Sequence, residues 1–421
     1  MAESLTNWAD SWTFQAEAIR RPGSVAELQE LVARSGKVRA LGTGHSFNDI
    51  ADTPETLVST AGLPGTFAID DAAKTVTVGS GMRYAEVGPR LHEQGYALAN
   101  LASLPHISVA GSVATGTHGS GDANGNLSTA VSGVEMVTAD GELVRLTRKD
   151  EHFDGAVVAL GALGVVTTLT LDVLPTFDVR QYVYFALPFE AIDQHFDDLF
   201  SAAYSVNVLT RWRDPVFDLL LIKRHAEQAD TTPAGESWFT AIPAEEPLTT
   251  GDGASWTEQL GVPGPWHERL PHFRPEFTPS TGVELQSEFF VPRRHAVAAL
   301  HAISEVRDRV APVLQASEIR TMAGDDLWLS PAYGHETVGI SFTWVKDMDG
   351  VRPVIDLLEE RLAPYDARPH WGKLFAAGPA DLYPRMDDFR ALMRHHDPYG
   401  KFTNAYVERF TPRASAHAVE R

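Results

Sequence analysis

The segment from Leu104 to Gly121 most constrains how this chain can fold, because small and hydroxyl-bearing residues dominate it. Its sequence is Leu-Pro-His-Ile-Ser-Val-Ala-Gly-Ser-Val-Ala-Thr-Gly-Thr-His-Gly-Ser-Gly, which carries too little apolar surface to form a core of its own. Ordering so many small residues without a ligand costs conformational entropy. The segment is therefore either a loose surface loop or a cradle whose backbone N–H groups and hydroxyls hold a bound molecule such as a pyrophosphate.

A second glycine-containing turn, Gly42-Thr-Gly-His-Ser-Phe, follows the short apolar run Val38–Leu41. Gly42 and Gly44 allow positive φ angles and a close approach of the backbone to a ligand. His45 in such a turn suggests a cofactor held by backbone contacts and by a bond to the ring; the alternative is an ordinary loop histidine. Neither glycine-rich segment matches a nucleotide motif, since one lacks Gly-Lys-Ser/Thr and the other lacks the third glycine of the dinucleotide fingerprint.

Composition excludes several classes of protein. The 421 residues are enough for two or three domains, and a net charge of −21 argues against a nucleic-acid partner. The absence of cysteine removes disulfides, thiolate metal sites and cysteinyl cofactor links, so any redox chemistry requires a bound group. We expect no metal site, because there is no His-x-x-x-His pair and His395-His396-Asp397 suits the solvated end of a helix. With neither a secretory signal nor an apolar span, a cytoplasmic protein is expected.

The order of elements predicts an α+β fold in two domains and a tail. Residues 1–176 combine helices and hairpins in a mixed domain, with hairpins over 66–81 and 131–147. Residues 177–370 carry longer helices, predicted over 189–204, 295–310 and 351–362, between alternating strands that suit an antiparallel sheet. The connection over about 225–275 is long and rich in Pro, Gly and Trp, which is typical of a functional loop. Residues 371–421 are expected to return to the first domain or to the site.

Three segments carry polar groups that suit a substrate pocket. Glu318 and Arg320 are two apart on a predicted strand and so share one face. In Ser341-Phe-Thr-Trp344 the serine and threonine share a face opposite the aromatic residues, and Lys373 follows a Trp-Gly turn. Such faces are commonly the wet side of an antiparallel sheet. If the three segments converge, their carboxylate, guanidinium, hydroxyls and ammonium suit a small neutral polyhydroxylated substrate.

Five segments, in this order, resemble those of the alditol oxidases, bacterial flavoproteins of the vanillyl-alcohol oxidase type that stand beside the sugar-lactone oxidases. They are Gly42–Asp49, Ser103–Gly121, Glu318–Arg320, Arg368–Lys373 and Lys401–Ala405. The resemblance covers essentially the whole chain and implies a two-subdomain FAD-binding fold plus a substrate (cap) domain. It implies oxidation of the terminal hydroxyl of alditols such as xylitol or sorbitol, with oxygen reduced to hydrogen peroxide. A sugar-1,4-lactone oxidase or dehydrogenase and a catalytically inert flavin-binding protein are the alternatives.

The resemblance also implies roles for single residues. His45 would carry FAD covalently. The other FAD-binding residues would be Leu41, Gly42, Thr43, Gly44, Ser46, Phe47, Ala102, Ser103, Ser108, Gly111, Ser112, Val113, Ala114, Thr115, Thr117, His118, Gly119 and Val166. The polyol site would comprise Ser103, Glu318, Arg320, Ser341, Thr343 and Lys373.

Within that polyol site, Glu318, Arg320 and Lys373 would be catalytic. Lys373 would bind the reacting hydroxyl and stabilise alkoxide charge, or even act as the base, while Glu318 would accept hydrogen bonds from substrate hydroxyls. Ala102 would leave room for oxygen. Close relatives carry a histidine where this chain has Ser341, which affects pocket size, chain-length preference and pH profile. The protein is expected to be a monomer whose partners are a polyol and oxygen.

Overall fold

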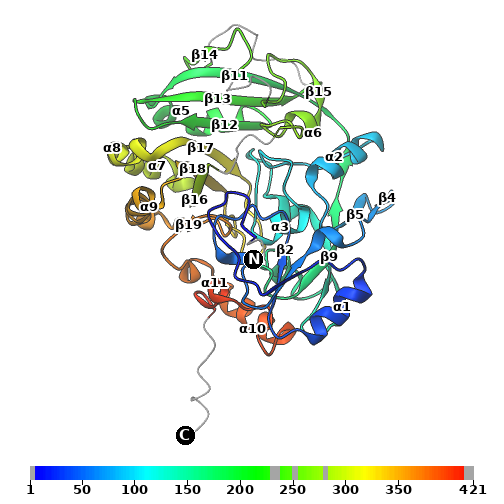
Figure 1. Ribbon diagram of the computed structural model, residues 1–421. Coiled ribbons are helices and arrows are strands. Elements are labelled where there is room, and N and C mark those ends of the chain that lie inside the picture. The colour runs from blue at the N-terminus through cyan, green and yellow to red at the C-terminus, as the bar shows by residue number, and fades with distance from the viewer. Residues whose placement is uncertain (1–4, 228–237, 249–254, 278–282, 412–421) are drawn as a thin grey trace.

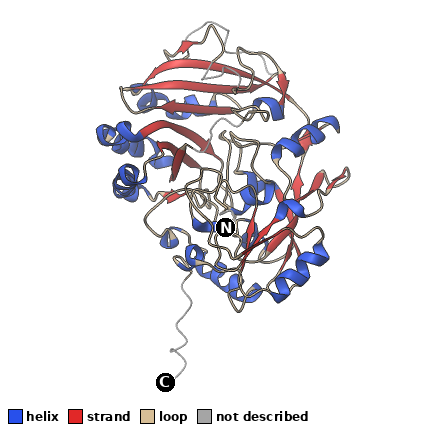
Figure 2. Cartoon of the chain, in the orientation of Figure 1, coloured by secondary structure: helices blue, strands red, loops and turns tan. Residues whose placement is uncertain are grey.

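The computed structural model describes residues 5–227, 238–248, 255–277 and 283–411, and the chain forms two parts stacked on each other (Figure 1). One part holds the smaller sheets, and the other holds one large sheet with helices on its outer side (Figure 2). This arrangement confirms the predicted α+β class. Within the described residues, no helix combines the length and the apolar composition needed to cross a bilayer.

The first part contains a parallel and an antiparallel sheet. The parallel sheet has the order β1-β3-β2, with bounds Ala18–Arg20, Thr56–Ser59 and Val38–Leu41. The antiparallel sheet has the order β4-β5-β9-β7-β8, with bounds Phe67–Asp70, Thr75–Gly79, Val165–Asp172, Val131–Val137 and Leu143–Thr147. Both predicted hairpins are present. Buried and partly buried residues alternate strictly along β9, as expected for a strand with one face in the core.

Four helices and a short ribbon complete this part. The helices are α1 (Val25–Arg34), α2 (Tyr84–Glu93), α3 (Val109–Ala114) and α4 (Phe153–Val157), and the ribbon pairs β6 (Tyr96–Ala97) with β10 (Leu174–Pro175). Ser24 caps α1 by accepting a hydrogen bond from the Glu27 N–H. The small-residue segment after Leu104 is therefore not a loose loop, because part of it forms α3.

The second part is built on one antiparallel sheet. Its order is β14-β11-β13-β12-β17-β18-β16-β19, and β15 also pairs with β11. The bounds are β11 Asp178–Pro188, β12 Ser205–Thr210, β13 Val216–His225, β14 Ile242–Pro243, β15 Gly264–Pro265, β16 Glu284–Pro292, β17 Leu314–Met322, β18 Thr337–Val345 and β19 Arg368–Pro369.

Helices cover the outer face of this sheet and leave its inner face toward the first part (Figure 1). They are α5 (Glu190–Ser201), α7 (Ala296–Glu305), α8 (Arg307–Val310) and α9 (Met348–Leu362), while α6 (Trp266–Arg269) lies beside β15. The three predicted helices are confirmed with shifted bounds. The second is broken at Val306, and the third starts earlier because the Asp347 side chain caps the Gly350 N–H.

The C-terminal residues pack against the first part. After α10 (Met386–His396), the Lys401 carbonyl accepts a hydrogen bond of 2.9 Å from the Val38 N–H, and Phe402 is buried beside that strand. The chain then forms α11 (Ala405–Glu408). The expectation of a solvated end at Asp397 is wrong. Its buried carboxylate accepts backbone hydrogen bonds from Lys401 and Phe402, both at 2.7 Å, and so fixes this turn.

Candidate active site

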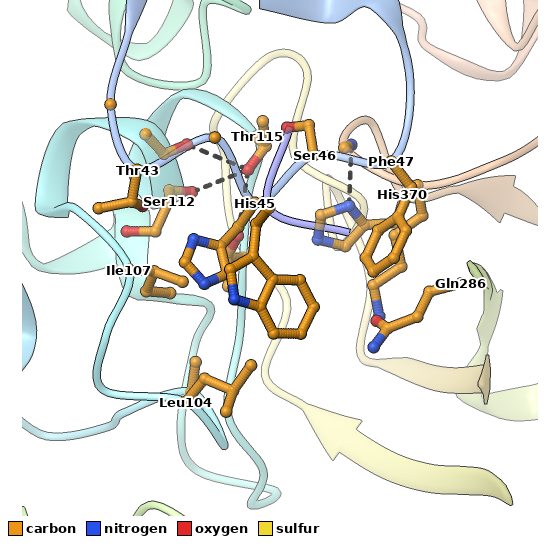
Figure 3. Close-up of a pocket in the computed structure, with 18 of the residues that line it drawn as sticks. Thr43, His45, Ser46, Phe47, Leu104, Ile107, Ser112, Thr115, Gln286 and His370 are labelled. Atoms are coloured by element: carbon orange, nitrogen blue, oxygen red, sulfur yellow. Dashed lines mark hydrogen bonds between the residues drawn. The ribbon is translucent and has the colours of Figure 1, made fainter. Parts of the chain in front are cut away.

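A cavity of about 440 Å³ lies where the two parts meet. One wall comes from the turn after β2 and from the segment around α3, and the facing wall comes from the inner face of β16, β17 and β18. Figure 3 shows this arrangement, with His45, Thr43, Ser112 and Thr115 on one side and Gln286 and His370 on the other. Because the sheet alternates, its apolar side chains face the helices and its polar ones face the cavity.

His45 lies at the end of the glycine turn that follows β2. Gly44 adopts φ +69°, and a Cβ on Gly42 would lie 2.2 Å from Ser108 Oγ, so both glycines are needed for the turn to meet the α3 segment. The His45 ring stacks on Trp8 at 4.9 Å between centroids. Burial lowers its pKa to about 4, with a further contribution from His106. The imidazole is therefore neutral at physiological pH.

The two ring nitrogens of His45 are not equally satisfied. Its buried Nδ1 has no hydrogen-bond partner of normal geometry among the described residues, although the Thr43 backbone lies near enough to favour protonation slightly. Buried polar atoms are almost always hydrogen-bonded. A buried, neutral imidazole nitrogen without a partner on a cavity wall indicates that a bound group supplies the missing contact.

Small residues and hydroxyls form the rest of this wall. The Thr43 hydroxyl accepts a hydrogen bond of 3.1 Å from the Ser108 N–H, which joins the two glycine-rich segments predicted to act together. A Cβ on Gly111 would lie 2.8 Å from Ser108 Oγ. The predicted FAD-binding residues that line the cavity are Leu41, Gly42, Thr43, Gly44, His45, Ser46, Phe47, Ala102, Ser103, Ser108, Gly111, Ser112, Ala114, Thr115, Thr117, His118 and Val166.

Val113 and Gly119 do not line this cavity. Val113 is buried in the core and borders a separate small apolar void beneath α3. A Cβ on Gly119 would meet the Asn100 side chain at 2.1 Å and the Leu101 carbonyl at 2.3 Å. Gly119 is therefore required for close chain packing, and the structure gives it no contact with the cavity.

Strand register gathers the acidic groups of the facing wall. Ser341 on β18 lies opposite Glu288 on β16 and opposite Glu318 on β17, so all three side chains share the inner face. Two residues further along β18, Thr343 lies opposite Gln286 on β16. Strand register thus brings Glu318, Ser341 and Thr343 together, whereas Lys373 reaches the cavity from the turn after β19.

The Glu318 carboxylate has two side-chain partners in one largely buried cluster. It forms an ion pair with Arg320 and accepts a hydrogen bond of 2.6 Å from His272 Nε2. Arg320 in turn donates to the Ser103 hydroxyl at 2.7 Å. Burial opposes ionisation of Glu318, but Arg320 and His272 outweigh it and hold the pKa of the carboxyl below its usual value. Glu318 is therefore an ionised acceptor.

Glu288 organises a second cluster that includes Lys373. Its two carboxylate oxygens contact His118 Nε2 at 2.9 Å and Lys373 Nζ at 2.8 Å. Burial raises the pKa of Glu288, but the cation at Lys373 and the His118 ring hold it well below its usual value. His370 lies nearby, and burial lowers its pKa to about 3. His118 therefore lines the cavity and also contacts Glu288 on the facing wall.

The long connection before β16 closes one end of the cavity. Trp256, His272 and Phe273 line it, and the His272 N–H donates to the Ser103 carbonyl at 3.1 Å. This agrees with the prediction of a functional loop over about 225–275, of which residues 228–237 and 249–254 lie outside the described residues.

Sequence reasoning missed several residues of the facing wall. They are Glu284, Gln286, Glu288, His272 and His370, together with the buried Lys223 behind them. Glu284, Gln286 and Glu288 alternate along one strand, so the same period of two that revealed Glu318 and Arg320 was available for them. His272 and Lys223 carry no local signal.

The chain matches two protein families and several characterised proteins over its length. It matches the FAD binding domain family over residues 16–147 and the D-arabinono-1,4-lactone oxidase family over residues 283–410. It is 51% identical to an alditol oxidase of a Streptomyces species, covering 97% of this chain and 99% of that protein. It is 31% identical to an L-gulono-1,4-lactone dehydrogenase of Mycobacterium tuberculosis, covering 97% and 99%.

The fold also matches that of a solved oxidase structure. Cholesterol oxidase from B. sterolicum matches with a TM-score of 0.78 at 14% sequence identity, covering 97% of this chain and 96% of that one. These matches and the cavity define an FAD-dependent oxidoreductase with the vanillyl-alcohol oxidase type of fold. Within that class, the chain belongs to the alditol oxidase family.

The residues present fit an FAD group. A long glycine-lined wall leaves backbone N–H groups and hydroxyls for phosphate and ribityl oxygens, since a Cβ at Gly42 or Gly111 would close the space against Ser108. The unpartnered Nδ1 of His45 lies on the same wall. Within the described residues, no group of three or more acidic or histidine side chains is arranged to hold a metal ion.

Proposed function

We propose that this protein oxidises the terminal primary hydroxyl of alditols such as xylitol and sorbitol to the aldose and reduces oxygen to hydrogen peroxide. The observation that carries the proposal is the pairing of a cavity suited to FAD with a facing wall of ionised and hydroxyl-bearing side chains, from Glu318 through Thr343 to Lys373. The 51% identity to an alditol oxidase over nearly the whole chain supports it.

The substrate wall suits a neutral chain of hydroxyl groups. Each hydroxyl both donates and accepts a hydrogen bond, so recognition needs acceptors and donors side by side. The ionised Glu318 supplies acceptor oxygens, and Arg320 and Lys373 supply donors. Because these groups are largely enclosed in the cavity, an alcohol that lacks the matching hydroxyls would leave them unpaired, which strongly disfavours short or deoxygenated alcohols.

Lys373 is proposed to bind the hydroxyl that reacts. Its Nζ lies 2.8 Å from the buried Glu288 carboxylate. Lys373 is proposed to donate a hydrogen bond that stabilises negative charge developing on the alcohol oxygen. Arg320 fixes the neighbouring carboxylate and adds a second positive charge. FAD, when bound, supplies the two-electron acceptor and the reaction with oxygen.

We further propose that FAD is attached covalently to His45. Three observations support this attachment: the ring is neutral, its Nδ1 is buried without a normal partner, and it lies on the glycine-lined wall. The cysteine-free chain excludes an attachment through both a histidine and a cysteine, which agrees with a single link through histidine. Ala102 borders the same cavity and is proposed to leave room for oxygen beside the flavin. The protein is proposed to act in the cytoplasm as a monomer.

A steady-state assay tests the reaction. Peroxide formation is compared for xylitol, sorbitol and other polyols against aldono-1,4-lactones, because relatives at 31% identity are lactone dehydrogenases. We expect faster turnover of polyols. Faster turnover of a lactone would establish the alternative, and no flavin bleaching with any polyol or lactone under anaerobic conditions would indicate an inert flavin-binding protein.

A further inference from the structure

Lys223 and His272 form a buried pair directly behind the substrate wall. Lys223 projects from β13 with none of its surface exposed, and its Nζ contacts the carbonyls of Leu270 and Pro271 and the Nδ1 of His272 at 3.1 Å. His272 is buried, and its other ring nitrogen contacts Glu318 at 2.6 Å. The pair therefore links the closing loop to the carboxylate that lines the cavity.

The contacts at the two ends determine the tautomer of His272. Nε2 faces an ionised carboxylate and must carry the proton, since two acceptors would otherwise meet at 2.6 Å. In the neutral ring Nδ1 is then an acceptor, and Lys223 donates to it. Lys223 also donates to the two loop carbonyls, so it orients the ring and the segment that carries the ring at once.

Buried side chains of the same sheet contact the loop at further points. Gln181, which lies opposite Lys223 on β11, contacts the carbonyl and hydroxyl of Thr257, both at 3.3 Å. The Thr257 hydroxyl donates to the Pro271 carbonyl at 2.8 Å. The loop is thus held on buried polar side chains of β11 and β13, and His272 is the part of it that reaches the acidic group of the site.

We propose that Lys223 and His272 are positioning residues for alditol oxidation: Lys223 holds His272 in the Nε2–H form, and His272 fixes the Glu318 carboxylate where a substrate hydroxyl can donate to it. The inference deepens the proposed function and rests on it. Without the imidazole N–H, Glu318 keeps only Arg320 and can rotate toward it. Without Lys223, Nδ1 of His272 loses its donor, and the ring loses the contact that fixes its orientation toward Glu318.

A predicted pH effect separates this role from a merely structural one. The charged groups that face His272 are Lys223 from β13 and Glu318 and Arg320 from β17. Burial lowers the pKa of His272 to about 4, and the charge of Lys223 lowers it further, against the effect of Glu318. Removal of the lysine charge therefore raises the pKa of His272, so protonation of the ring disturbs the site at a higher pH.

The first experiment compares Lys223→Met with Lys149→Met, an exposed lysine far from the cavity lining. Anaerobic rapid mixing with xylitol measures the rate of flavin reduction across pH, and FAD content and reoxidation by oxygen check that the enzyme is intact. We expect Lys223→Met to reduce its flavin on the order of tenfold more slowly, with the acid fall in rate moved to higher pH and the two control measurements unchanged. A wild-type rate and pH profile would overturn the proposal.

A second pair of variants keeps the proposal testable if Lys223→Met does not fold. In His272→Gln a side-chain amide can still donate to Glu318, whereas in His272→Leu it cannot. We expect reduction to be several-fold faster in His272→Gln than in His272→Leu. Equal loss in both would overturn the positioning role.

Histidine ¹⁵N shifts give a readout that does not depend on turnover. We expect His272 to be protonated on Nε2 and unprotonated on Nδ1 in the wild-type holoenzyme at neutral pH, and the opposite tautomer would refute the inference. If no alditol reduces the wild-type flavin, the proposed function fails, while the same shifts compared between wild type and Lys223→Met still decide whether Lys223 holds the His272 ring; identical His272 shifts in the two proteins would overturn that role.

Discussion

The two walls of the cavity use different chemistry to hold their ligands. The wall formed by residues 41–47 and 108–117 consists of glycines, hydroxyls and a neutral histidine, and its donors are largely backbone N–H groups. The facing wall on β16, β17 and β18 consists of buried carboxylates paired with Arg320, Lys373 and histidines. Backbone donors can bind a large group along its whole length. A small polyol, in contrast, is recognised by individual side chains that each contact one of its hydroxyls.

This difference also predicts how each wall responds to substitution. On the neutral wall most side chains are small, and the substitution of one of them should affect how the cofactor is bound. On the charged wall, each group has a partner, and removal of one leaves the other buried without compensation. Substitutions there should affect the rate of flavin reduction, the stability of the chain or the choice of substrate.

The largest effect on the neutral wall is expected for His45→Ala. If His45 carries the flavin, the covalent link is lost completely, because no other side chain is placed to replace it. Flavin fluorescence in the band on a denaturing gel measures this directly. His106→Ala is the matched control, since His106 lies close enough to influence the pKa of His45 yet does not line the cavity. Fluorescence that persists in the His45→Ala band would refute the attachment.

On the charged wall the largest effect is expected for Lys373→Ala. We expect FAD to remain bound while the rate of flavin reduction by xylitol falls roughly 100-fold or more, because the donor for the reacting hydroxyl is gone. Anaerobic rapid mixing gives the rate, and the flavin absorbance gives the occupancy. A near-normal rate would remove Lys373 from the reaction, and loss of flavin from this variant would contradict the separate roles of the two walls.

A site residue could be predicted from the sequence when the pattern that reveals it is contained in a few consecutive residues. The alternation of Glu318 with Arg320 and of Ser341 with Thr343 is local, because a strand places every second side chain on one face. The glycine turn around His45 was visible for the same reason, since it is contained in a few consecutive residues. Such local patterns also sufficed for the predicted α+β class, for the two hairpins and for the three helices of the second part.

Contacts between distant segments could not be predicted in this way. His118 and Glu288 are 170 positions apart, and only the docking of the two parts brings them together. Gly119 shows the converse case, because it continues the small-residue pattern while it packs against Asn100 outside the cavity lining. Composition indicates that a segment of small residues binds a ligand, but it does not show at which residue the binding segment ends.

Glu288→Gln tests the charged wall through stability. The low pKa of Glu288 means that its contribution is fully present above the usual value of 4.5 and is lost as the pH falls below it. Urea unfolding at pH 7 should show a loss of about 2 kcal/mol, since Lys373 and His118 lose a charged partner. The difference from wild type should shrink at acid pH.

The control for this measurement is Glu284→Gln on the same strand, where the Glu284 carboxylate accepts a hydrogen bond of 2.7 Å from the neutral Gln286 amide. We expect a smaller loss of stability in that variant. A difference between Glu288→Gln and wild type that grows as the pH falls below 4.5 would show that Glu288 does not act as an ionised partner in the folded protein.

The smallest effect is expected for Ser341→His, which enlarges a side chain between the two acidic clusters. Ser341 lies opposite both Glu288 and Glu318, and its hydroxyl is only 3.4 Å from the Glu318 carbonyl, so an imidazole there must take space from the cavity. A six-carbon polyol should lose more than a five-carbon one, and the ratio of kcat/KM for sorbitol to that for xylitol should fall a few-fold, as expected for small changes in pocket volume. Ser341→Ala, which keeps the space open, should leave the ratio close to wild type. An unchanged ratio in both variants would show that the substrate chain does not pass between Glu288 and Glu318, and recognition would then depend on the Gln286 and Thr343 end of the wall.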